Sequence, residues 1–183
     1  MFVCRSAILV LLMTAVVPAD AGESGRPKIL SRLIVDGMNN HDWPRATKIL
    51  KGIFPAARYF IIGYGTNDLG TWPDTPRTSK RIIENLGQMV QAVTGRGKRP
   101  ILFNVPYANE SMFPPRIVEE LHAKRDYHNA RLKEYCDRGG VPLADICSRL
   151  RAEHFADELH PNGAGAKLIA EAVFVVLRTI HEA

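Results

Sequence analysis

The sequence predicts one α/β domain, built as a three-layer α/β/α sandwich around a mostly parallel sheet. Short, nearly continuous apolar runs at residues 58–62, 100–103 and 141–146 are typical of strands that are buried on both faces. Segments with apolar residues at helical spacing alternate with these runs, and this alternation implies parallel strands with helices covering both faces. With 183 residues, 46% of them hydrophobic, the chain is long enough to bury a substantial core.

The amino-terminal segment, residues 1–21, has the pattern of a secretory signal peptide. Arg5 supplies a positive charge, residues 7–17 are apolar, and Ala19-Asp20-Ala21 fits a cleavage site of the small-x-small type. The apolar run is too short to span a bilayer, so no stable membrane span is expected. We therefore expect export to the periplasm or the extracellular space.

Residues 22–57 are expected to form a divergent first βα unit. A polar lead-in precedes a strand at 29–35, which ends at Asp36-Gly37. Asp42 has the position of an N-cap for a short helix that runs to about Ile53, and Pro55 ends it.

Expected strands and helices alternate regularly in the remaining residues, 58–183. The strand at 58–62 leads through a loop into a helix opened by Thr75-Pro76, and the strand at 100–103 leads through a proline-rich loop into a long helix. Gly139 is the expected C-cap of that helix. The strand at 141–146 and a helix over about 164–180 complete the domain.

The charge of the chain bears on its expected partners, and its cysteines bear on disulfide formation. The net charge is +5, but the basic residues are scattered and lack interleaved aromatic residues, so a nucleic-acid partner is not expected. After signal cleavage two cysteines would remain, Cys136 and Cys147. In an oxidising compartment they could form a disulfide, and two buried thiols are the alternative.

Two short stretches carry residues suited to catalysis. Gly65-Thr66-Asn67-Asp68 follows a buried strand, where glycine permits a sharp turn and an asparagine side chain can donate a hydrogen bond to an oxyanion. Taken alone, this stretch is more typical of an Asx-type turn. Asp157 precedes His160 by three residues, so the carboxylate can fix the imidazole tautomer and let the histidine act as a general base. Taken alone, this second stretch could be a helix-capping loop.

Together, Gly65-Thr66-Asn67-Asp68 and Asp157-Glu158-Leu159-His160-Pro161 resemble the third and fifth sequence blocks of the SGNH (GDSL-type) hydrolase family, over residues 58–183. The resemblance implies a flavodoxin-like fold and hydrolysis of carboxylic or acetyl esters by a Ser-His-Asp mechanism, without a cofactor or metal. It implies a small-molecule or carbohydrate ester as substrate. It assigns His160 as the base, Asp157 as the residue that orients it, Asn67 to the oxyanion hole, and Gly65 and Asp68 to the oxyanion loop.

The front of the domain departs from the family pattern. The family has Gly-Asp-Ser after its first strand, with that serine as nucleophile, whereas the strand at 29–35 is followed by Asp36-Gly37-Met38 and no serine. The interval from Gly37 to Gly65 is also short, as if one βα unit were lacking. Residues 33–50 are instead similar to the opening of trehalose-utilisation (glutamine-amidotransferase-like) domains.

The nucleophile is therefore not identified from the sequence. The hypothesis is an ester hydrolase-like protein with weak or absent activity, and the alternative is a non-catalytic protein that binds an acylated carbohydrate or a similar ligand. The serines that could substitute are Ser24, Ser31, Ser79, Ser111 and Ser148.

Overall fold

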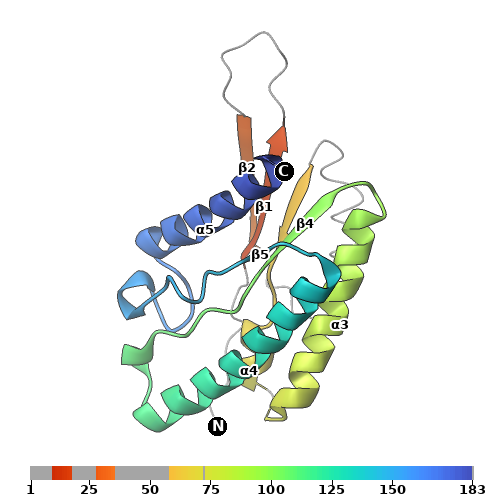
Figure 1. Ribbon diagram of the computed structural model, residues 1–183. Coiled ribbons are helices and arrows are strands. Elements are labelled where there is room, and N and C mark those ends of the chain that lie inside the picture. The colour runs from red at the N-terminus through yellow and green to blue at the C-terminus, as the bar shows by residue number, and fades with distance from the viewer. Residues whose placement is uncertain (1–9, 18–27, 36–57, 72, 183) are drawn as a thin grey trace.

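The computed structural model describes residues 10–17, 28–35, 58–71 and 73–182 of the chain (Figure 1). In order, its elements are β1 (Val10–Val17), β2 (Lys28–Val35), β3 (Tyr59–Ile62), α2 (Thr66–Thr71), α3 (Thr75–Thr94), β4 (Arg99–Phe103), a 3₁₀ turn (Glu110–Met112), α4 (Pro115–Gly139), β5 (Leu143–Ala144), a second 3₁₀ turn (Ala152–His154) and α5 (Gly163–Glu182).

The centre of the fold is a parallel sheet in the order β3-β4-β5. Tyr59 pairs with Arg99 and Ile62 with Leu102, and Leu102 in turn pairs with Leu143. β1 and β2 form a separate antiparallel pair, and β1 lies against β3. All three parallel strands end at the same edge, so the loops that follow them gather there.

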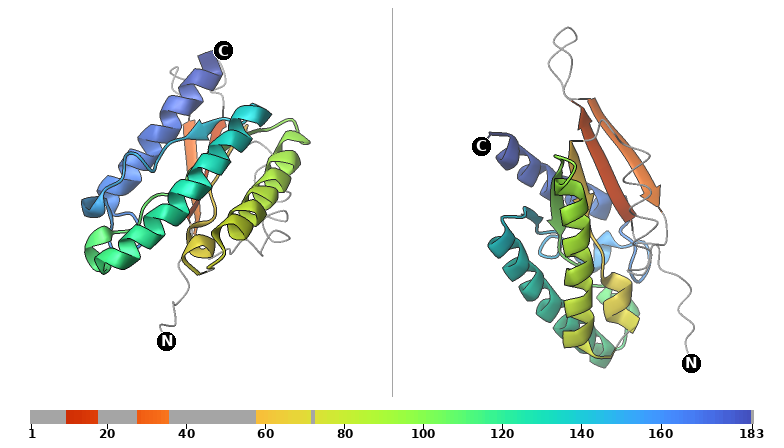
Figure 2. Two further views of the ribbon diagram at one scale, coloured as in Figure 1. Left: turned by 60° about the horizontal axis from the view of Figure 1, so that its bottom comes forward. Right: turned by 90° about the vertical axis from the view of Figure 1, so that its right-hand side faces the viewer.

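Helices cover both faces of this sheet, as Figures 1 and 2 show. Phe60 and Ile62 of β3 pack in one core with residues of α3 and α4. Tyr59 and Ile61 point to the opposite face and pack in a second core with residues of α5. The alternation explains why β3 is an unbroken apolar run, since every side chain in it is buried.

Local sequence signals fix the ends of the two long neighbouring helices, α3 and α4. The Asp74 side chain caps α3 by accepting a hydrogen bond from the backbone N–H of Arg77 at 3.0 Å, and proline follows in the first turn. α4 ends at Gly139, and the left-handed residue that caps it is Gly140, with φ of 61°. The expectation that Gly139 would be the C-cap is wrong by one residue.

The predicted three-layer α/β/α class is confirmed, with specific differences in individual elements. The strand expected at 29–35 is present as β2, and the run 141–146 forms only the two-residue strand β5. Asn67, expected in a loop, lies in the short helix α2. Val10–Val17, inside the segment with the signal-peptide pattern, forms β1. The helix expected from Asp42 lies outside the described residues.

Two further observations concern the cysteines and the possibility of a membrane-spanning helix. Cys136 and Cys147 are both free thiols and both buried, so the structure contains no bridge between them. Among the described residues, no helix is both long enough and apolar enough to cross a membrane.

Candidate active site

The loops that follow β3, β4 and β5 form the candidate site at the carboxyl edge of the sheet. These loops are residues 63–65, which lead into α2, residues 104–114, and residues 145–162. In parallel α/β sheets this edge is where ligands bind. Both sequence-predicted stretches lie in these connections, on either side of the β4 loop.

His160 and Asp157 form a close pair in the loop before α5. His160 Nδ1 lies 2.6 Å from Asp157 Oδ2. Asp157 Oδ1 accepts the backbone N–H groups of Leu159 and His160 at 2.8 and 2.7 Å. Because the carboxylate holds both the backbone and the ring, it fixes the direction in which the imidazole points.

The charge state of Asp157 suits this arrangement. Partial burial acts to raise its pKa, but the two backbone N–H donors and the His160 ring outweigh that effect and hold the pKa below its usual value. The side chain of His160 is 37% exposed, so a substrate can reach the ring. The pair therefore has the geometry of a general base with its orienting carboxylate.

The connection after β3 requires glycine at two positions. Gly65 has φ of 122°, a conformation that other residues rarely adopt. A Cβ atom at Gly63 would lie 2.0 Å from the ring of Phe103, so only glycine fits there without displacement of the ring. After this turn α2 begins, and it carries Asn67 and Asp68.

Asp68 anchors the start of α2. Its side chain is 7% exposed and lies 3.8 Å from the Arg81 guanidinium of α3. The Leu69 N–H donates to the Gly65 carbonyl at 2.9 Å, which closes the first turn of the helix. Asn67 is half-buried at this turn. The structure thus places Asn67 and His160 at the same edge of the sheet, on connections that follow different strands.

A residue that the sequence analysis did not identify, Asn109, joins the β4 loop to the His160 loop. Its backbone N–H donates to the Glu158 carbonyl at 2.9 Å, and its side-chain amide donates to the Asp157 carbonyl at 3.3 Å. Its side-chain oxygen accepts from the Ser111 hydroxyl at 2.7 Å. Asn109 therefore holds the loop that carries the Asp157–His160 pair. A lone asparagine in a proline-rich loop gives no sequence signal for this role.

Two more asparagines form hydrogen bonds at the same edge of the sheet. Asn104 Oδ1 accepts the backbone N–H groups of Ile146 and Cys147, both at 2.9 Å, and its amide donates to Asp145 at 2.8 Å. Asn129 of α4 makes a paired contact with the backbone of Val105, accepting its N–H at 2.9 Å and donating to its carbonyl at 2.8 Å. Side-chain amides thus satisfy backbone groups where the strands end.

A polar cluster lies behind the β4 loop. The Tyr107 hydroxyl donates to Asp126, and this hydrogen bond together with burial raises the pKa of Tyr107 well above its usual value. The Tyr107 ring also stacks at 4.2 Å on His122. Arg125 is buried nearby, and desolvation lowers its pKa to about 10.

The described serines have partners other than His160. Ser79 lies 2.9 Å from His128 in the interior, and Ser111 bonds Asn109. The Ser148 backbone N–H donates to Asp145. Ser24 lies outside the described residues, and the side chain of Ser31 in β2 is likewise not described. The described part of the chain therefore contains no serine hydroxyl with a hydrogen bond to His160.

The sequence profile of the GDSL-like Lipase/Acylhydrolase family matches residues 13–168. The chain belongs to this family. No curated protein sequence matches the chain. The family match begins within β1, well before residue 58, where the resemblance found from the motifs begins. It includes residues 33–50, which were expected to resemble trehalose-utilisation domains instead.

Solved structures of other proteins share the GDSL fold. A GDSL-like lipase from Bacteroides thetaiotaomicron has 19% sequence identity and a TM-score of 0.61, covering 79% of this chain and 73% of its own. The acetylxylan esterase Axe2 from Geobacillus stearothermophilus, solved as a catalytic mutant, has 19% identity and a TM-score of 0.56, covering 77% of this chain and 68% of its own. The OSK domain of Drosophila Oskar has 17% identity and a TM-score of 0.59, covering 81% of this chain and 74% of its own.

The GDSL family match begins earlier in the chain than the motifs alone indicated. Residues 29–35 were expected to form the first strand of the family, but the match begins at residue 13, inside β1. Downstream of β1 the chain reads Gly22-Glu23-Ser24. This differs from the Gly-Asp-Ser of the family by one methylene group in the middle residue. Ser24 is one of the five serines considered above, and β1, the strand before it, ends at the edge of the sheet opposite to the His160 loop (Figure 1).

Proposed function

We propose that this GDSL-family protein hydrolyses carboxylic esters, acetyl esters among them, with His160 as general base and Asp157 as the residue that orients it. The observation that carries the proposal is the 2.6 Å contact between His160 Nδ1 and Asp157 Oδ2. With Nδ1 held by the carboxylate, Nε2 is the nitrogen that can take a proton. The partial exposure of the ring supports access by an ester.

Each step of the reaction has a residue suited to it. A hydroxyl nucleophile attacks the ester carbonyl while His160 Nε2 takes its proton, and the Asn67 side chain donates a hydrogen bond to the oxyanion that forms. His160 then gives the proton to the departing alcohol. Water attacks the acyl-enzyme with the same histidine as base, and the carboxylic acid and the free hydroxyl are regenerated.

The nucleophile of this reaction is not assigned. Gly22-Glu23-Ser24 follows β1, but β1 runs opposite to β3 and ends at the other edge of the sheet from the His160 loop (Figure 1). A carbohydrate ester as substrate is supported only by analogy with the acetylxylan esterase among the structures of similar fold.

The test is hydrolysis of p-nitrophenyl acetate by the wild-type protein and three variants. His160→Ala is expected to lower kcat by roughly 10³-fold or more, because nucleophile and base act as one unit. Ser24→Ala is expected to leave kcat unchanged, because β1, the strand before it, ends at the other edge of the sheet. Ser148→Ala, at an exposed position, is the matched serine control and should leave kcat unchanged. Turnover that persists in His160→Ala would remove the mechanism, whereas loss of turnover in Ser24→Ala would identify Ser24 as the nucleophile.

A second candidate function is a non-catalytic protein that binds an acylated carbohydrate. It is favoured by one observation, the absence of an intact Gly-Asp-Ser anywhere in the chain. No turnover by the wild-type protein, together with saturable binding of an acetylated xylo-oligosaccharide in calorimetry, would support this function over hydrolysis.

Export of the protein is a proposal that rests on the signal-peptide pattern of residues 1–21. The same segment contains β1, so cleavage after Ala21 would remove that strand. Amino-terminal sequencing of the protein secreted by expressing cells tests the proposal. Gly22 is the expected first residue, and retention of Met1 in the cell-associated protein would contradict it.

A further inference from the structure

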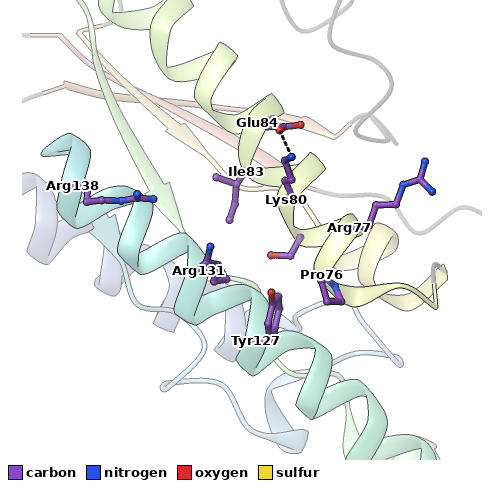
Figure 3. Close-up of a pocket in the computed structure, with 9 residues that line it drawn as sticks. Pro76, Arg77, Lys80, Ile83, Glu84, Tyr127, Arg131 and Arg138 are labelled. Carbon is purple, nitrogen blue, oxygen red and sulfur yellow. Dashed lines mark ion pairs between the residues drawn. The ribbon is translucent and has the colours of Figure 1, made fainter.

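A groove of about 450 Å³ lies between α3 and α4 (Figure 3). Both helices cover the same face of the sheet and run side by side in Figures 1 and 2. The groove is separate from the Asp157–His160 pair, which lies in the loop before α5. Its lining residues are Pro76, Arg77, Ser79, Lys80, Ile83 and Glu84 of α3, and Tyr127, Arg131 and Arg138 of α4.

We propose that this groove binds a small ligand that carries a chain of phosphoryl groups. The proposal goes beyond ester hydrolysis and does not depend on it. Its volume lies in the range of roughly 300–1,000 Å³ that is typical of small-molecule sites.

The charge of the groove is the first argument. Four cationic side chains line it against the single carboxylate of Glu84. Neither Arg77 nor Arg138 forms an ion pair with a carboxylate of the described residues. Arg138 uses only its Nε, which donates to the Glu134 backbone carbonyl at 3.3 Å. The Arg138 guanidinium therefore remains available to an anion, whereas the Arg77 guanidinium points away from α4 (Figure 3).

The ion pairs that do line the groove are weak competitors. Lys80 and Glu84 are 3.8 Å apart, with side chains 77% and 58% exposed, and Arg131 lies 2.8 Å from Glu134, with side chains 53% and 54% exposed. Exposed pairs of this kind contribute little to stability, because water screens both charges. A multiply charged anion can therefore draw Lys80 and Arg131 away from their carboxylates.

The arrangement of the cations indicates an extended ligand. Arg131 and Arg138 extend from α4 toward α3, and Lys80 lies across from them (Figure 3). Positive groups thus follow one another along the groove instead of meeting at one point. The forked guanidinium group matches the oxygens of a phosphoryl group in a bidentate contact. A row of phosphoryl groups satisfies such a row of cations better than one phosphate ion does.

Calorimetric titration with inorganic triphosphate, inorganic phosphate and citrate tests the proposal, without any ester present. Triphosphate is expected to bind once per chain and at least tenfold more tightly than phosphate or citrate. Arg131→Ala and Arg138→Ala should each weaken triphosphate binding severalfold. Arg178→Ala, which removes the same charge from an exposed position on α5, is the matched control and should change binding less than twofold.

Several results would overturn the proposal. They are no saturable binding of triphosphate, equal binding of citrate, or an equal loss in Arg178→Ala and the groove variants. Because the altered side chains are exposed, circular dichroism of each variant should match the wild type, and a groove variant that folds normally and keeps full affinity also refutes the assignment.

Discussion

The buried contact between Ser79 and His128 ties α3 to α4 and should make the stability of the protein depend on pH. His128 is 0% exposed, and its Nδ1 lies 2.9 Å from the Ser79 hydroxyl. Burial lowers the pKa of His128 from 6.5 to about 4, because the charged imidazole loses its hydration. The perturbation is acidification from pH 7 to pH 4.

The sign follows from proton binding in the two states. The unfolded chain protonates His128 below pH 6.5, whereas the folded protein keeps it neutral down to about pH 4. The unfolded state therefore binds more protons in this window, and the free energy of unfolding falls as the pH falls. At about 1.4 kcal/mol per pH unit, the loss from this one residue reaches about 3 kcal/mol at pH 4.

Urea unfolding at a series of pH values measures the effect. His128→Gln is the matched variant, because an amide can still bond Ser79 but does not titrate. Acidic residues contribute equally to both proteins, so the difference between the two stability curves isolates His128. The free energy of unfolding of the wild type minus that of His128→Gln should be constant above pH 6.5 and should fall by about 3 kcal/mol toward pH 4. Parallel curves for the two proteins across the whole range would refute the reasoning.

Two further predictions concern the connections that carry the site. Gly63→Ala places a methyl group against the Phe103 ring and should lower the free energy of unfolding by about 1–3 kcal/mol in urea titration. The double variant with Phe103→Leu should recover part of this loss. An equal loss in the single and the double variant would argue against the clash. Asn109→Ala removes the side-chain contact with the Asp157 carbonyl and should lower kcat more than it raises KM for p-nitrophenyl acetate. An unchanged kcat in a folded Asn109→Ala variant would show that the His160 loop holds its position without this residue.

Periodicity was sufficient to predict the interior of the fold. Thr75-Pro76 was expected to open α3 and the last helix was expected over about 164–180, close to the observed α5, because proline-led starts and apolar faces are properties of local sequence. α2 was missed, since six residues containing a glycine, Thr66–Thr71, show no helical period. The length of β5 was also overestimated, because an apolar run does not specify how many of its residues find a pairing partner.

The Asp157–His160 pair could be predicted because its spacing is local, three residues within one loop. The contact between Asn109 and the Asp157 carbonyl could not be predicted from the sequence, because the two residues are 48 positions apart and meet only in the tertiary fold. β1 was not expected for another reason. An apolar run after an arginine is compatible with both a signal peptide and a strand, so the local sequence does not specify the pairing of Val10–Val17 with Lys28–Val35.

The brevity of β5 also affects how copies of this protein meet one another. In the described parallel sheet β5 is one of the two outer strands, and it consists of Leu143 and Ala144 alone. An outer strand offers its unpaired backbone groups as a template on which another chain can extend the sheet. Two residues supply too short a template for stable pairing, so this side of the sheet is protected from edge-to-edge aggregation at high protein concentration.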